Sequence, residues 1–172
     1  HNISPAGNLT MIGGNLGGTG NIHLGGNLDW SGGTIGGTGA LNVAGATTLT
    51  NGTTLDTRTL TLNGGGSFDN YLNMNNSANL VIPAGKTLTC ATSGNTTWGG
   101  TDGTLTLAGT LIKNGPGFLA FDVLVFQNTG TIHLNQGDIY LGFWGKNGTH
   151  TNATFNIAAG SYLGPNGGTH TF

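Results

Sequence analysis

The residues best suited to acid–base and nucleophilic chemistry are few and widely spaced in this chain. A catalytic triad needs a Ser, Cys or Thr beside a histidine and a carboxylate. The histidines are His1, His23, His133, His150 and His170. His23 and His133 each stand between two aliphatic residues, which predicts that both point outward from strands several repeats apart. We expect no triad, because these histidines cannot share a site.

Paired carboxylates cleave glycosides when they lie roughly 5–9 Å apart. The acids of the chain are all aspartates: Asp29, Asp56, Asp69, Asp102, Asp122 and Asp138. Most of them fall in expected turns, no alignment of the repeats brings a convincing pair together, and no basic residue stands beside them to serve a lyase. We therefore predict no catalytic residues and no enzyme activity, with a polysaccharide-active enzyme as a lesser alternative.

Metal binding also lacks its usual signatures. Calcium-binding β-rolls repeat a Gly-Gly-x-Gly-x-Asp nonapeptide, whereas this chain has the Gly-Gly runs without aspartates at the fixed offset. His1 could bind copper as an amino-terminal histidine, but that chemistry needs a second histidine ligand in a sandwich-type scaffold. We expect no metal and no cofactor.

Composition excludes several function classes. Glycine supplies 35 of 172 residues, charged residues supply 6 %, glutamate is absent and the formal net charge is −2. Nucleic-acid binding lacks the basic stripe it needs, and no apolar run reaches the roughly 20 residues of a membrane helix. Cys90 is the single cysteine, which rules out an intrachain disulfide. A surface built from Thr, Asn and Gly predicts strands and turns, and an extracellular or cell-surface protein.

An internal repeat organises the first half of the chain. Residues 13–26 read GGNLGGTGNIHLGG and residues 32–45 read GGTIGGTGALNVAG, with seven of 14 positions identical at an offset of 19. Each unit contains two aliphatic residues around one outward residue, the alternation of a strand with one buried face. We aligned these triplets on one face: Leu9-Thr10-Met11, Ile22-His23-Leu24, Leu41-Asn42-Val43, Leu60-Thr61-Leu62, Leu80-Val81-Ile82, Leu105-Thr106-Leu107, Ile132-His133-Leu134 and Phe155-Asn156-Ile157.

Three strands and three turns in about 20 residues predict an all-β fold, a parallel β-helix (β-solenoid) of seven or eight coils. We expect one domain over 1–172, with regular repeats at about 8–90 and looser ones at about 91–163. A β-sandwich is the alternative. Its support is the longer apolar runs at 118–126 and 139–144, which fit either a hairpin or a cap on a solenoid.

The repeat GG-T-(I/L)-GG-T-G-x-(L/I)-x-(V/L), preceded by Trp30-Ser31, resembles the repeats of bacterial secreted β-solenoids. These are the autotransporter-passenger and filamentous-haemagglutinin-like surface proteins. The resemblance covers residues 13–64 well and fades after about residue 100. It implies a surface-displayed fibre or adhesin and carries no particular ligand, and this chain departs from the family in being very short.

Two sets of residues are candidates for glycan chemistry. Asn-x-Ser/Thr sequons predict possible glycosylation at Asn2, Asn8, Asn51, Asn75, Asn95, Asn147 and Asn152. Aromatic side chains bind sugars by stacking when they lie on the surface, and otherwise fill the core. The candidates for stacking are Trp30, Trp98, Tyr140 and Trp144.

The strand edges suggest assembly. The repeats begin at Leu9, few charged residues guard the edges, and the alternating segment 169–172 could pair with a neighbouring subunit. We predict the structural protomer of an extracellular filament that self-associates end to end through open edges or strand exchange. A monomeric adhesin or glycan-binding module is the alternative. Ice binding ranks lower, because the aligned outward column, which includes His23, Asn42 and Val81, is not a uniform threonine array.

Overall fold

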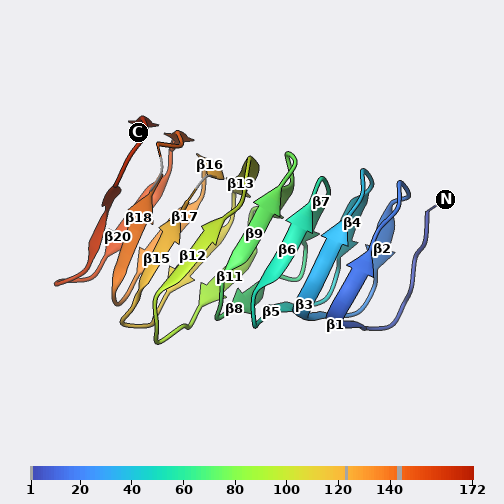
Figure 1. Ribbon diagram of the computed structural model, residues 1–172. Helices are drawn as coiled ribbons and strands as arrows, with labels where there is room; N and C mark the ends of the chain where they lie inside the picture. The colour runs from blue at the N-terminus through green and yellow to red at the C-terminus, as the bar shows by residue number, and fades with distance from the viewer. Residues whose placement is uncertain (1, 123, 143–144) are drawn as a thin grey trace.

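Short parallel strands wind into eight stacked coils and confirm the predicted β-solenoid. The computed structural model describes residues 2–122, 124–142 and 145–172, and these residues form 22 strands and no helix. Every strand pairing found there is parallel and joins one coil to the next. The coils lie side by side along a rod with the two termini at opposite ends (Figure 1). The β-sandwich alternative is therefore wrong.

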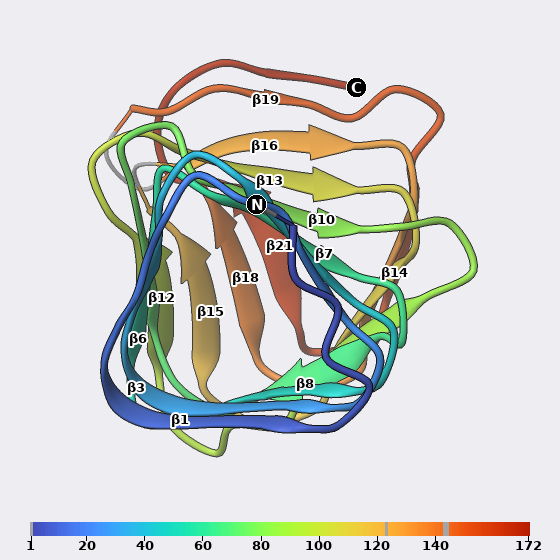
Figure 2. The same ribbon diagram turned by 90° about the vertical axis from the view of Figure 1, so that its right-hand side faces the viewer.

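Three walls enclose the interior when the rod is viewed along its axis (Figure 2). Face 1 is an eight-stranded sheet of β2 (Ile22–Leu24), β4 (Ala40–Val43), β7 (Thr59–Leu62), β10 (Asn79–Ile82), β13 (Gly103–Leu107), β16 (Leu124–Asn128), β19 (Gly148–Thr149) and β22 (His170–Thr171). Face 2 contains β5 (Thr47–Leu49), β8 (Gly66–Phe68), β11 (Thr87–Cys90), β14 (Thr110–Lys113), β17 (Thr131–Leu134) and β20 (Thr154–Ile157).

Face 3 contains β6 (Thr53–Asp56), β9 (Leu72–Asn75), β12 (Thr96–Gly99), β15 (Phe118–Phe121), β18 (Asp138–Leu141) and β21 (Tyr162–Pro165). The two long strands β1 (Leu9–Leu16) and β3 (Leu28–Gly36) run round the corner between faces 2 and 3. The run at 118–126 is neither a hairpin nor a cap. It forms two consecutive strands, β15 on face 3 and β16 on face 1.

Alternation along each strand builds the core. Inward residues stack on the equivalent residue of the next coil, so that Leu41, Leu60, Leu80 and Leu105 form one buried column on face 1. An aromatic chain from Phe68 through Trp98 and Phe121 to Phe126 fills the middle of the rod, with ring centroids 4.3, 5.9 and 4.9 Å apart. Each coil thus buries apolar side chains mainly against its neighbours, the arrangement expected of a solenoid.

Glycine repeats where coils approach closely at a corner. Gly26, Gly45 and Gly64 follow one another at intervals of 19 residues. A Cβ on Gly45 would collide with the carbonyl oxygen of Gly26 one coil earlier, and a Cβ on Gly64 would collide with that of Gly45. This contact accounts for part of the glycine repeat, because no larger residue fits between the stacked turns.

Arg58 joins three early coils from inside the wall. Its side chain is fully buried. Nε donates to the carbonyl of Gly36 at 2.7 Å, and Nη2 donates to that of Gly18 at 2.8 Å. Nη1 lies 3.3 Å from the carbonyls of both Gly20 and Ala40. The guanidinium therefore provides hydrogen-bond donors for carbonyls of two earlier coils. Burial lowers its pKa.

The predicted outward column is wrong at both ends of the chain. His23, Asn42, Thr61, Val81 and Thr106 are register neighbours on face 1, as expected. The column then continues through Gln127, Thr149 and Thr171. The aligned triplets that begin at Leu9, Ile132 and Phe155 lie instead on face 2, as parts of β1, β17 and β20. The apolar–polar–apolar pattern recurs on every face, so the pattern alone does not identify the wall.

Candidate functional site

Three aromatic side chains are in contact on the outside of face 3, one on each of three neighbouring coils, with Tyr140 two residues further along its strand than Phe118 and Tyr162 are along theirs. We call Phe118, Tyr140 and Tyr162 the aromatic strip. Phe118 and Tyr140 are half-buried and Tyr162 is 50 % exposed. Their ring centroids are 5.6 Å apart for Phe118 and Tyr140, and 5.7 Å apart for Tyr140 and Tyr162. They face outward because the residues beside them, such as Leu119 and Ile139, point into the core.

Asp138 anchors the aromatic strip. Its Oδ1 accepts a hydrogen bond from the backbone N–H of Tyr162 at 3.0 Å, and its Oδ2 accepts one from the Tyr140 hydroxyl at 3.3 Å. The Tyr140 hydroxyl is a neutral donor at physiological pH, and desolvation and the Asp138 carboxylate raise its pKa further. The strip therefore presents ordered rings beside a carboxylate on one side of the rod.

Two of the four candidates for stacking are core residues instead. Trp30 and Trp98 are 1 % and 0 % exposed, because both occupy inward positions of their strands. Their indole N–H groups donate to the carbonyls of Gly32 and Asn70, respectively. Tyr140 points outward and belongs to the aromatic strip. Trp144 lies outside the described residues, and so does His1, the residue considered for copper binding. Sequence reasoning missed Phe118 and Tyr162, although Phe118, Tyr140 and Tyr162 recur at intervals of 22 residues, close to the length of one coil.

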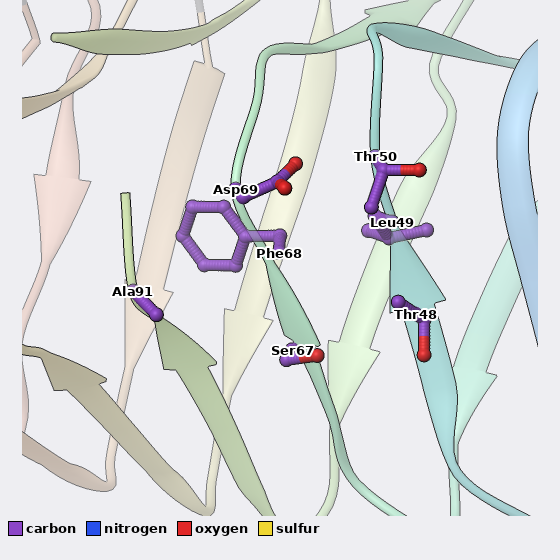
Figure 3. A pocket seen from close by; sticks show the side chains of 7 residues that line it. All are labelled: Thr48, Leu49, Thr50, Ser67, Phe68, Asp69 and Ala91. Carbon is purple, nitrogen blue, oxygen red and sulfur yellow. The ribbon is translucent and has the colours of Figure 1, made fainter. Parts of the chain in front are cut away.

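A shallow depression on face 2 is a weaker candidate. It holds about 180 Å³ and is lined by residues of β5 and β8 and by Ala91 after β11. Figure 3 shows Thr48 and Ser67 on the two adjacent strands, with Thr50 and Asp69 at the strand ends. Its apolar floor comes from Leu49 and Phe68, which are core residues. The depression offers hydroxyls and one carboxylate without an ordered aromatic surface.

Two aspartates serve a turn rather than a catalytic pair. Asp56 and Asp102 flank the turn at Asn76 and Ser77, both of which have positive φ. Asp56 accepts a hydrogen bond from the Asn76 side chain at 2.6 Å, and Asp102 accepts one from the Ser77 backbone N–H at 2.9 Å. The Ser77 N–H and the Thr101 hydroxyl are the main causes that lower the pKa of Asp102. These bonds hold a strained turn and use the carboxylates as caps.

The single cysteine is a core residue. Cys90 is fully buried in β11 and is the register neighbour of Lys113, which is also buried. The Lys113 ammonium donates to the carbonyl of Gly115. Burial raises the pKa of the Cys90 thiol and lowers that of the Lys113 ammonium. A buried thiol with a raised pKa is an inert one. Across the described residues, no three His, Cys, Asp or Glu side chains gather as a metal site.

The sequon asparagines lie at coil corners, and most of them take part in coil stacking. The Oδ1 atoms of Asn2, Asn8, Asn95 and Asn147 each accept the backbone N–H of the equivalent corner residue one coil later. Asn75 does the same for Thr101 at 3.1 Å. Asn51 and Asn152 sit in exposed turns with positive φ. Glycosylation at all seven positions stays a prediction.

Threonines form one short column on face 2. Thr87, Thr110, Thr131 and Thr154 are register neighbours on four successive coils. The adjacent outward column reads Thr89, Ile112, His133 and Asn156. Only one of these two columns consists of threonine over these coils, whereas a flat ice-binding face would need a regular two-dimensional array. Ice binding therefore stays a prediction without added support from this face.

Comparisons with known proteins leave the identity of the chain open. No protein-family model, curated protein or solved structure matches it. Within the residues that the structure describes, no helix has the length and apolar character needed to cross a membrane.

Proposed function

We propose that this chain is a structural protomer of an extracellular fibre, in which the last coil of one copy pairs with the first coil of the next. The observation that carries the proposal is an inward column on face 2. Leu134 in this column is fully buried, whereas Ile157, its register neighbour in the last coil, is 46 % exposed. A further coil in the same register would cover Ile157 as β20 covers Leu134.

Apolar exposure occurs at both ends of the rod. Leu9 and Leu16 of β1 are only partly buried, whereas Leu28 and Ile35, their register neighbours in the next coil, are fully buried. At the other end, Phe172 is 67 % exposed after β22. Among the described residues, the edge strands at these ends also leave one row of backbone N–H and C=O groups without a strand partner, which is a template for pairing. Because every pairing in the rod is parallel, a coil added at either end continues the same geometry and generates an open linear assembly.

Charge does not oppose such pairing. The first 28 and the last 26 residues contain no Asp, Glu, Lys or Arg. Natural sheets protect open edges with such charged residues, lysine above all. The segment at 169–172, which could pair with a neighbouring subunit, contains β22, and β22 pairs with β19 within the chain as the edge strand of its sheet. Edge pairing therefore has more support than strand exchange as the joint.

The test is the concentration dependence of molar mass in size-exclusion chromatography with light scattering. We expect the native chain to form species larger than one copy, and the Ile157→Lys variant to remain monomeric because a charge would be buried in the joint. The matched control is Val125→Lys, which places the same charge on the outside of face 1 in mid-rod, where Val125 is 37 % exposed. A native chain that stays monomeric at millimolar concentration would contradict the proposal.

The extracellular location and the kinship with secreted bacterial surface proteins remain part of this proposal. They rest on the composition and on the repeat at 13–64. The adhesin alternative has a separate observation in its favour, the aromatic strip, and is argued from that surface below.

A further inference from the structure

The aromatic strip lies where coil stacking cannot cover it. Phe118, Tyr140 and Tyr162 project from the outer surface of face 3, whereas an additional coil would pair along the axis at the end of the rod. Fibre formation and occupancy of the strip are therefore independent.

The rings are held in place before any ligand arrives. The ring and hydroxyl of Tyr162 lie over Gly164, because a Cβ on Gly164 would meet them. Ala120, the outward register neighbour of Tyr140 on the preceding coil, is also a small residue and is only 1 % exposed. Asp138 holds the Tyr162 backbone and the Tyr140 hydroxyl. Ordering these side chains in advance lowers the entropy lost when a ligand binds.

The chemistry of the strip suits a sugar. Pyranose rings offer C–H faces that pack against aromatic rings and hydroxyls that donate to carboxylates, and Tyr combines an apolar ring with a polar tip. Asp138, whose strand position lies between those of Phe118 and Tyr162, supplies an acceptor beside the rings. The same carboxylate and the net charge of −2 disfavour an anionic glycan by repulsion.

The spacing indicates the direction of the sugar chain. Each coil contributes one ring, and the successive centroids are separated by 5.6 and 5.7 Å. This separation is close to the length of one pyranose unit in an extended polysaccharide. The rings are tilted by 72° and 43° to one another, so successive units would contact a ring edge and a ring face in turn rather than a flat platform.

We infer that the aromatic strip binds a neutral pyranose polysaccharide, with the sugar chain running along the axis of the rod. Tyr162, the most exposed ring, supplies the largest contact area. Tyr140 supplies a hydroxyl whose position Asp138 fixes. Asp138 accepts hydrogen bonds from sugar hydroxyls with its remaining lone pairs.

Isothermal titration with defined hexasaccharides tests the inference. The probes are β-1,4-linked hexamers of glucose, mannose and N-acetylglucosamine, with hexagalacturonate as the anionic counterpart. We expect at least one neutral hexamer to bind, hexagalacturonate to bind more weakly, and Tyr162→Ala to weaken the binding about tenfold through loss of one ring contact.

The matched control is Tyr71→Ala. Tyr71 is a 49 % exposed tyrosine just before β9 on the same wall, away from the strip, and its ring lies over Gly52. We expect this variant to bind as the native chain does. Circular dichroism and thermal midpoints of both variants separate lost binding from lost folding.

The inference is overturned if no neutral hexamer binds the native chain, or if Tyr162→Ala and Tyr71→Ala weaken binding equally. Binding measured on the monomeric Ile157→Lys variant keeps this outcome separate from that of the fibre proposal, because Ile157 lies on face 2.

Discussion

His150 and His170 stack against each other in the last two coils, with Nε2 of His150 3.1 Å from Nδ1 of His170 and ring centroids 5.4 Å apart. The His150 side chain is 2 % exposed. The outer ring nitrogens of the pair, Nδ1 of His150 and Nε2 of His170, are buried and have no hydrogen-bond partner in the described residues. One of the two rings donates and the other accepts in the bond between them, so protonating both rings would break that bond inside a buried cluster.

The first prediction concerns acid stability. Burial, and then the charge of His170, lower the pKa of His150 from 6.5 to about 4. The unfolded chain therefore binds more protons than the folded chain between these values, and stability falls as the pH falls. We expect the contribution of His150 to the free energy of unfolding to be constant above about pH 7 and to decrease by on the order of 3 kcal/mol between pH 6.5 and 4.

Urea unfolding at a series of pH values measures this effect. His150→Phe should remove most of the pH dependence, since the phenyl ring fits among Phe126, Phe155 and Phe172 and does not titrate. His23→Gln, a change at an exposed histidine, should leave the pH dependence in place. Identical pH profiles for the native chain and His150→Phe would contradict the assignment.

The second prediction concerns Arg58. Arg58→Met keeps much of the side-chain volume but leaves the carbonyls of Gly18 and Gly36 without the guanidinium that bonds them. We expect a loss of about 2–3 kcal/mol in the free energy of unfolding. Lys86→Met, a change at a half-buried lysine in the turn after β10, should alter stability by no more than about 0.5 kcal/mol. Equal stability of the two variants would show that Arg58 is not a structural bridge.

The third prediction concerns the glycine corner. Gly45→Ala places a methyl group against the carbonyl of Gly26, so the stacked turns must separate. We expect a loss of at least about 2 kcal/mol. Gly13→Ala is the matched control, because a Cβ there meets nothing within 4 Å. Thermal unfolding followed by circular dichroism checks both variants, and similar midpoints would mean that close approach does not explain the glycine repeat.

The fold was predictable where coil length is constant. Leu41 and Leu60 follow Ile22 at 19-residue intervals, and they stack in that register on face 1. The interval rises to 25 between Leu80 and Leu105, because the loops between strands lengthen. Beyond that point, the spacing of apolar triplets no longer identifies the face, which is why Ile132 was assigned to the wrong wall.

The candidate site was predictable only in part. Tyr140 has an apolar residue on each side, and this alternation correctly indicates an outward position. Trp30 and Trp98 also alternate, and their parity places them among the inward residues, which is the core role that the sequence left open for them. The contact of Tyr140 with Phe118 and Tyr162 depends on the lengths of the two coils that separate these strands, which are 20 and 24 residues. No local sequence pattern reveals those lengths.

Electron microscopy of the purified chain tests the central claim, end-to-end assembly, most directly. Negative-stain images at rising concentration should show unbranched fibres of constant width. Their axial repeat should be close to eight coils of about 4.8 Å each, or roughly 38 Å. The Ile157→Lys variant should give short single rods under the same conditions. Uniform single particles of the native chain at every concentration would contradict the account, and the aromatic strip would then stand as the functional surface of a monomer.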